Sequence, residues 1–198
     1  MNRLFPLFLK LEGRKCLVVG AGKIAESKVA SLLDTGATLH VVAPEATGRI
    51  KAWERTGALH WHRRKFRNTD LAGCLLVVVA TSSRELHERI FRSAKRRNII
   101  CNVVDVPDLC DFYYPAVVHR GSLQIAVSTA GKSPALAQRL RKELQAQFGP
   151  EYEEWIAELG IEREGLRLAG IPPAELNAQL HEMATDSSLR KFLKRRRK

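Results

Sequence analysis

The sequence predicts an α/β fold in its first half, followed by a smaller mixed region and a helical C-terminal region. Two observations support this prediction. Up to about residue 104, short apolar runs alternate with amphipathic stretches, which is the pattern of strand–helix–strand units in a parallel sheet. After residue 105 the pattern changes to turn-forming residues, two short apolar runs and then helical periodicity. We therefore expect a boundary within residues 105–115.

The predicted strands are short runs of aliphatic residues that end at turn-forming residues. The run 75–80, Leu-Leu-Val-Val-Val-Ala, is the clearest central strand, because it is apolar on both faces. In chain order, we expect parallel strands at residues 16–19, 38–42, 59–65, 75–80 and 99–104, and then two short strands at 116–119 and 123–128 joined by a turn at Gly121–Ser122.

The predicted helices follow apolar residues that recur three or four positions apart. In the first helix, residues 23–34, the residues expected on one apolar face are Ile24, Val29, Leu32 and Leu33. Gly36 lies just past its end, where helices commonly stop. Further helices are expected at residues 46–56, at 84–97, from 135 to 148, from about 151 onward, and as two short segments around the break at 170–173.

The chain is strongly basic. Its 198 residues include 33 Lys and Arg against 21 Asp and Glu, which gives a formal charge of +12. Basic clusters lie at residues 63–67, 95–97 and 190–198. This balance favours a polyanionic partner, such as nucleic acid, an acidic membrane face or a small polycarboxylate. A charge run is also typical of a solvated face or a frayed tail, which is the interpretation we favour for residues 190–198.

The cysteines and the N-terminus indicate a cytoplasmic protein. Cys16, Cys74 and Cys101 lie in or beside apolar runs, and no C-x-x-C pair occurs, so we expect small buried side chains in a reducing compartment. The first eleven residues are too short and too interrupted for a signal peptide, and no apolar stretch approaches the ~20 residues of a membrane span. His60 and His62 share a strand face without an evident third ligand, so no metal site is predicted.

The sharpest local motif is Gly20-Ala21-Gly22-Lys23-Ile24-Ala25, a G-x-G-x-x-A pattern between a predicted strand and a predicted helix. In a Rossmann-like sheet the first glycine permits a tight turn, and the second lets the backbone approach a pyrophosphate at the helix N-terminus. We predict a dinucleotide site that includes Gly20, Gly22, Lys23 and Ile24. A purely structural glycine turn is the alternative.

The second strand should end beside the adenosine ribose. Its tip lacks the usual acidic residue, but Glu45 follows Pro44 two residues later. Glu45 could accept hydrogen bonds from the ribose hydroxyls, and its charge would repel a 2′-phosphate, which favours NAD over NADP. The competing interpretation is that Glu45 caps the next helix.

Ligands of open α/β sheets bind outside the carboxyl ends of the strands. Thr81 and Ser82 follow the fourth predicted strand, so we expect them beside the cofactor. Asp105 ends the fifth strand, near the nicotinamide end, where a carboxylate could take a proton as a hydride leaves. Asp105 could instead cap a loop, and Asp108 and Asp111 are competing bases.

Together these segments resemble one family. The matching motifs are Phe5-Pro6-Leu7-Phe8-Leu9, Gly20 to Lys28, Val41-Val42-Ala43-Pro44-Glu45, Ala80-Thr81, Cys101-Asn102-Val103-Val104-Asp105, Phe112 with Pro115, and Ala126 to Ala135. In their order and spacing, over roughly residues 4–148, the chain is similar to precorrin-2 dehydrogenase, the dehydrogenase and ferrochelatase half of sirohaem synthase. The family often has Ser-Gly-Gly where this chain has Thr129-Ala130-Gly131.

The resemblance implies NAD-dependent oxidation of precorrin-2 to sirohydrochlorin, with Asp105 at the position of the family's catalytic aspartate. It also implies that Lys23, Ile24, Pro44 and Glu45 lie along the cofactor. The residues expected to contact the polycarboxylate tetrapyrrole are Asn102, Ser128, Thr129, Gly131, Lys132 and Ser133. Some relatives also insert ferrous iron, and the sequence leaves open whether this chain does.

The resemblance further implies three regions and a homodimer. These are an NAD-binding domain at residues 1–113, a dimerisation region at 114–150 and a helical region with a basic tail at 151–198. Two other functions are kept as alternatives: a chelatase without dehydrogenase activity, and a non-catalytic NAD sensor whose basic tail binds nucleic acid. A membrane partner is not expected, and nucleic acid is not the favoured one.

Overall fold

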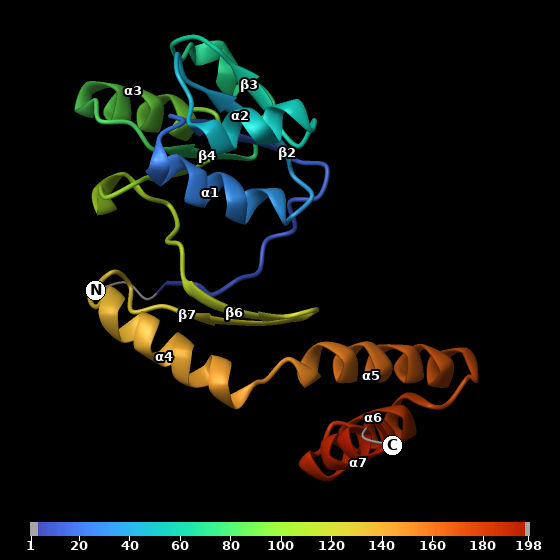
Figure 1. Ribbon diagram of the computed structural model, residues 1–198. Coiled ribbons are helices and arrows are strands. Elements are labelled where there is room, and N and C mark those ends of the chain that lie inside the picture. Colours follow the sequence, from blue (N-terminus) through green and yellow to red (C-terminus); the bar gives the residue numbers. More distant parts are fainter. Residues whose placement is uncertain (1–3, 197–198) are drawn as a thin grey trace. The chain divides into compact units, whose positions relative to one another are not determined.

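The structure, a computed structural model, describes residues 4–196 and divides into two units, one up to Tyr113 and one from Tyr114 onward (Figure 1). The first unit contains a parallel sheet with the strand order β3-β2-β1-β4-β5. Its strands are β1 (Lys15–Val19), β2 (Thr38–Val42), β3 (His60–His62), β4 (Leu76–Val79) and β5 (Ile100–Val103). The predicted α/β fold with a parallel sheet is confirmed.

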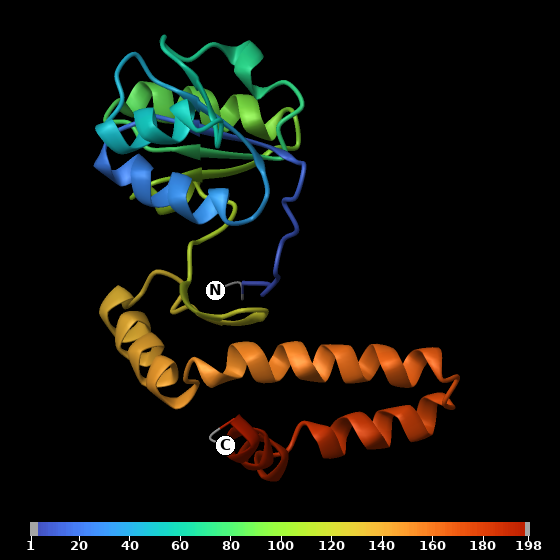
Figure 2. The ribbon, with the colours of Figure 1, turned by 45° about the vertical axis from the view of Figure 1, so that its right-hand side comes forward.

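Helices cover both faces of this sheet, as the crossover rule for parallel strands requires. They are α1 (Lys23–Leu33), α2 (Gly48–Arg55) and α3 (Arg84–Lys95), with the short 3₁₀ helices η1 (Asn68–Leu71) and η2 (Pro107–Leu109). α1 packs on β1 and β2, and α3 packs on β4 and β5 from the opposite side (Figures 1 and 2). The helices shield the central strands, where Val77, Val78 and Val79 are fully buried.

The strand order reverses between β1 and β4. Chain segments that leave these two strands diverge to opposite faces, which opens a crevice at their carboxyl ends. Gly20 directly follows β1, and Ala80 and Thr81 follow β4. The fold therefore places the glycine motif and Thr81 at this reversal.

The second unit is a hairpin covered by helices. β6 (Ala116–Arg120) and β7 (Leu123–Val127) are antiparallel, with Ala116 opposite Val127 and a turn at residues 121–122. The helices are α4 (Pro134–Gln147), α5 (Glu151–Leu168), α6 (Pro173–Met183) and α7 (Asp186–Arg196). α4 and α5 pack on the hairpin, and α6 and α7 pack on α5.

The basic C-terminal segment is helical and not frayed up to Arg196. Phe192 of α7 is buried, and Arg195 and Arg196 form ion pairs with Glu158 and Glu154 of α5. Arg197 and Lys198 lie outside the described residues. The frayed-tail alternative is therefore wrong for α7, whereas its exposed basic side chains form the solvated face that we also expected. Among residues 4–196, no helix is both long and apolar enough to cross a membrane.

Three local predictions need correction. The strand expected at 59–65 is only His60–His62. The helix expected at 46–56 begins at Gly48, because Thr47 provides its N-cap. Ile24 was expected on the buried face of α1, but 56% of its surface is exposed, because Ala25, Val29 and Leu32 form that face.

Candidate active site

Gly20 is required by the fold itself. Its φ of +108° is disfavoured for residues with a β-carbon, and a β-carbon would lie 2.2 Å from the carbonyl oxygen of Ala80. The Gly20 N–H donates to the carbonyl of Val42 at 2.9 Å, which ties the loop to β2 as well. The glycine loop is therefore held between the ends of β2 and β4.

Gly22 has no such structural requirement. Its φ of −83° and ψ of −174° suit any residue, and a β-carbon would meet nothing within 4 Å. Gly22 is the N-cap of α1 and makes no side-chain cap hydrogen bond, whereas Thr47 and Ser83 cap α2 and α3. The first N–H groups of a helix have no acceptors within it, so this end presents donors and open space that fit a pyrophosphate.

The side chains beside this helix end are exposed. Lys23 and Ile24 occupy the first turn of α1 and both point away from the core. An exposed isoleucine costs hydrophobic stabilisation in the protein alone, and a bound cofactor would cover it. The contact of Lys23 and Ile24 with the cofactor stays a prediction.

Glu45 is not a helix cap, so the competing interpretation of this residue is wrong. Thr47 caps α2 by accepting from the N–H of Ile50, and its own N–H donates to the carbonyl of Ala21 at 3.1 Å. The segment after β2 is thereby joined to the glycine loop. Pro44 and Glu45 are both exposed at the carboxyl end of β2, where Glu45 could reach a ribose.

Thr81 is held by a histidine that our sequence reasoning missed. His87 of α3 is 7% exposed, and its Nε2 lies 2.8 Å from the carbonyl oxygen and 3.1 Å from the Oγ1 of Thr81. Ser82, the next residue, is exposed. The helical spacing that puts His87 on the same buried face as Ile90 and Ala94 was the available signal.

Asp105 lies in a left-handed turn two residues after β5. Its φ is +62°, a left-handed conformation that only Gly, Asn and Asp adopt readily, and its side chain is exposed. Residues held in such conformations cluster at functional sites. The turn thus presents a carboxylate at the carboxyl end of the sheet, where Gly22 also lies.

Neighbouring polar residues tie the end of the loop that follows this turn to β5 and α3. Asn102 is 6% exposed and donates to the carbonyl of Phe112 at 2.8 Å. Asp111 accepts from the N–H of Cys101 at 3.0 Å and pairs with Lys95. The Asp111 carboxylate is thus committed to the loop, which removes it as a competing base. The amide of Asn102 has the same structural use, and its contact with substrate stays a prediction.

Lys28 of α1 lies within electrostatic range of Asp105. Burial lowers the pKa of Lys28 below its usual range, and the negative charge of Asp105 opposes that shift. The carboxyl end of the sheet therefore has a half-buried cation, Lys28, close to Asp105.

The loop 128–133 belongs to the second unit and is organised by its own hydroxyls. Ser128 accepts from the N–H of Ala130, and Thr129 accepts from the N–H of Ser133. Ser133 in turn caps α4. Gly131 and Lys132 are exposed. The loop thus presents an ammonium group on a preformed turn, and its role as a substrate contact stays a prediction.

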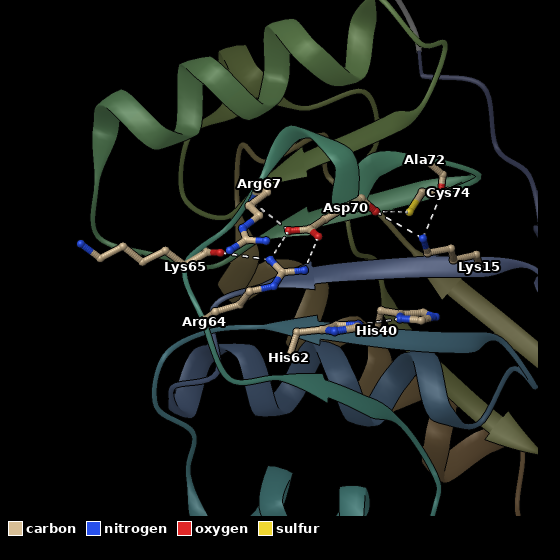
Figure 3. A network of polar contacts seen from close by, with 9 residues as sticks. All are labelled: Lys15, His40, His62, Arg64, Lys65, Arg67, Asp70, Ala72 and Cys74. Carbon is tan, nitrogen blue, oxygen red and sulfur yellow. Dashed lines mark hydrogen bonds and ion pairs between the residues drawn. The ribbon is translucent and has the colours of Figure 1, made fainter.

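A separate polar network connects the segment around η1 with residues of β1, β2 and β3 (Figure 3). Arg64 binds Asp70 through two hydrogen bonds of 2.9 and 2.6 Å, and Lys15 donates to the carbonyl of Ala72. His40 of β2 lies with its Nδ1 3.0 Å from the Nε2 of His62. Within residues 4–196, no three His, Cys, Asp or Glu side chains are arranged to hold a metal ion. Arg64 and Lys15 are therefore engaged within the fold.

The cysteine prediction is confirmed for burial. Cys16, Cys74 and Cys101 are buried free thiols. Burial raises the pKa of Cys16 to about 11 and that of Cys101 to about 12. These thiols are therefore protonated and unreactive near neutral pH.

Comparison with known families matches two parts of the chain. Residues 7–116 match a family described as "Putative NAD(P)-binding", and residues 120–147 match the family "Sirohaem biosynthesis protein central". The chain is 43% identical over 149 residues to the sirohaem synthase of Pseudomonas entomophila and 40% identical over 141 residues to that of Photorhabdus laumondii. These matches cover 75% and 71% of this chain, but only 32% and 30% of those enzymes. The chain thus spans about a third of their length.

Among solved structures, the chain is similar over its whole length to SirC, a precorrin-2 dehydrogenase. The two share 28% of their residues with a TM-score of 0.79, and the match covers 97% of this chain and 98% of SirC. Both units therefore have counterparts in that enzyme.

Proposed function

The chain belongs to the family described as "Putative NAD(P)-binding" and also matches the central family of sirohaem biosynthesis, and from this premise we propose that it oxidises precorrin-2 to sirohydrochlorin with NAD as the hydride acceptor. The observation that carries this proposal is that a space suited to a dinucleotide and a carboxylate suited to a base lie at the same, carboxyl end of one sheet. The open space at Gly22 beside the uncapped α1 suits a dinucleotide. Asp105, after β5 of the same sheet, suits a base.

Glu45 supports NAD as the cofactor rather than NADP. Its carboxylate is exposed at the end of β2 and does not cap α2. A carboxylate at this position binds ribose hydroxyls and repels a 2′-phosphate. The first basic residue of α2, Arg49, has its guanidinium 4.8 Å from the ring centre of Trp53, and this contact draws it toward the helix rather than the cofactor.

Asp105 would act as the proton acceptor. When bound, NAD supplies an electron-poor nicotinamide ring that can accept a hydride. Oxidation removes one hydride and one proton from precorrin-2, so the protein must provide a route for the proton. The exposed Asp105 carboxylate can take that proton and release it to water. Asn102 and Asp111, which fix the loop, would keep the carboxylate in place.

Cations of the protein would bind the carboxylates of the tetrapyrrole. Lys28 is half-buried near Asp105, and Lys132 is exposed on the turn at residues 128–133. A basic protein also attracts a polycarboxylate over longer distances. We therefore retain residues 128–133 as a proposed substrate contact.

A homodimer is also part of the proposal. A two-stranded hairpin is marginal by itself, and the second unit buries few large apolar side chains besides Trp155 and Phe192. Ile161 and Leu168 of α5 are 74% and 81% exposed. Association with a second copy would cover such surface, and sedimentation analysis would test it: a monomer at micromolar concentration would contradict it.

The decisive experiment is anaerobic absorption spectroscopy of the purified protein with precorrin-2, with and without NAD. We expect NAD-dependent growth of the sirohydrochlorin spectrum with one NADH formed per product. Folded protein that leaves intact precorrin-2 unchanged would overturn the proposal. Ferrous iron added afterwards tests the ferrochelatase activity, which would convert sirohydrochlorin to sirohaem.

Deleting the basic segment 190–198 would not be a clean test of the sensor alternative. Deletion would remove the buried Phe192 and the ion pairs of α7 with α5, so it would also disturb the fold. A variant with Arg190, Lys191 and Lys194 changed to Gln keeps those contacts. Retained turnover in this variant supports the enzyme, whereas salt-sensitive nucleic-acid binding lost with these charges supports the sensor.

A further inference from the structure

His87 is a buried polar side chain whose hydrogen bonds all involve one residue of the proposed cofactor site. It lies in the first turn of α3, which Ser83 caps. Its Nε2 is 2.8 Å from the carbonyl oxygen of Thr81 and 3.1 Å from the Thr81 hydroxyl. A buried imidazole is costly unless it is hydrogen-bonded, so the site retains it for these contacts or for packing.

The carbonyl oxygen decides which ring nitrogen carries the proton. A carbonyl can only accept, so Nε2 must carry a hydrogen and donate it. A protonated Nε2 cannot accept from the Thr81 hydroxyl, which can only share the same hydrogen as a second acceptor. The hydroxyl hydrogen of Thr81 therefore has no acceptor in this pair and points elsewhere.

Thr81 is also fixed on its other side by the glycine loop. Its Cγ2 methyl lies 3.3 Å from the position that a β-carbon of Gly20 would occupy. The N–H of Ala80 donates to Val19 at 2.8 Å, which keeps the segment after β4 against β1. With its methyl against Gly20 and its oxygen near His87, the Thr81 side chain has little rotational freedom.

We infer that His87 is a positioning residue, which orients the Thr81 hydroxyl so that it donates a hydrogen bond to the bound nicotinamide cofactor. This inference rests on the proposed function, because it assigns a partner to the same site. His87 does not touch the cofactor itself and acts through Thr81.

The test compares cofactor affinity by calorimetry in matched variants. His87→Leu and Thr81→Val should each weaken NAD binding about tenfold, as expected for loss of one well-placed hydrogen bond. His87→Gln places its amide N–H donor close to the position of the ring Nε2 and should restore binding to within about threefold. In the double variant His87→Leu with Thr81→Val, we expect no further loss, because both changes remove the same interaction.

Ser93→Ala is the matched control for general destabilisation. Ser93 is a fully buried polar residue in the same helix, where its Oγ accepts from Arg97 at 2.6 Å. This variant should lower the melting temperature without changing NAD affinity. In His87→Leu, the KM for NAD should rise while the KM for precorrin-2 stays within about twofold, a split that a merely structural role would not produce.

Two results would overturn the inference: wild-type NAD affinity in His87→Leu, or losses that multiply to about a hundredfold in the double variant. The proposed function fails separately, because a wild-type protein that binds NAD without oxidising precorrin-2 contradicts the reaction. The affinities of the variants would still decide the role of His87.

Discussion

Gly20 faces the carbonyl oxygen of Ala80 so closely that a β-carbon would lie 2.2 Å from it, while the neighbouring Gly22 faces open space. The two glycines of one motif therefore serve different purposes. Gly20 allows two strand ends to pack, and Gly22 leaves room for a ligand. Gly20 would thus be needed for folding even in a chain that had lost its cofactor.

Substitutions at the two glycines should separate stability from binding. Gly20→Ala should lower the free energy of unfolding by about 2–4 kcal/mol, because it adds a clash to a left-handed backbone. Gly22→Asp should unfold like the wild type but lose detectable NAD binding, because a carboxylate would occupy the space and field suited to pyrophosphate. Urea unfolding and calorimetry measure the two effects. Unchanged NAD affinity in Gly22→Asp would refute the cofactor site.

Substitutions of Asp105 should nearly abolish turnover and leave NAD binding intact. Asp105→Asn keeps a side chain that tolerates the left-handed backbone and should reduce kcat by about 100-fold or more. Asp105→Ala should lose as much activity and also about 1 kcal/mol of stability. Steady-state kinetics and urea unfolding provide the comparison. Near-normal turnover in either variant would show that another group takes the proton.

Glu45 should control the choice between NAD and NADP. Removing its charge in Glu45→Gln should lower the ratio of kcat/KM for NAD over NADP by about tenfold, because the repulsion of a 2′-phosphate is lost. Glu12→Gln is a suitable control, since Glu12 is exposed in the turn before β1, at the amino end of the strands and away from the proposed cofactor site. If both variants keep the wild-type ratio, cofactor choice lies elsewhere.

Stability should fall as the pH decreases below 6.5. Burial, together with the charges of Lys15, His60 and His62, lowers the pKa of His40 from 6.5 to about 4. In this window the unfolded chain binds a proton that the folded protein does not, so the free energy of unfolding decreases as the pH falls from 6.5 towards 4. Because His40 is partly exposed, we expect a loss of about 1–2 kcal/mol.

Urea unfolding of the wild type and His40→Gln at pH 7.0, 5.5 and 4.5 would check this effect. These conditions stay above the range of Asp70, whose pKa remains below 3.8 because hydrogen bonds from Arg64 and Arg67 outweigh its burial. The variant should show the weaker pH dependence. Parallel profiles for the two proteins would exclude His40 as the cause.

Most of the sheet could be predicted because its strands are buried on both faces and therefore apolar throughout. β2 was predicted at its observed bounds, and β1, β4 and β5 within two residues. β3 was predicted too long, because it is an edge strand with a single apolar residue, Trp61, between two histidines. The next three residues, Arg63 to Lys65, are all basic, and the chain has already left the sheet there.

The site could be predicted only where a local motif carries it. Gly20 and Gly22 are recognisable from their spacing, and Asp105 from its place after a strand. His87 could not be assigned, because its role depends on α3 packing beside Thr81, a contact set by the tertiary fold. The approach of His40 to His62 likewise depends on pairing between β2 and β3 and has no signature within either strand.

The left-handed turn at Asp105 also shapes how this chain can change over evolutionary time. Single-base changes in an aspartate codon include Asn and Gly, which accept a φ of +62° without strain, and Ala, Val and Tyr, which do not. A single-base change can therefore remove the proposed base with little loss of stability. A gene duplicate that took this route would encode a stable protein with its dinucleotide cradle intact, ready to respond to cofactor levels without consuming the cofactor.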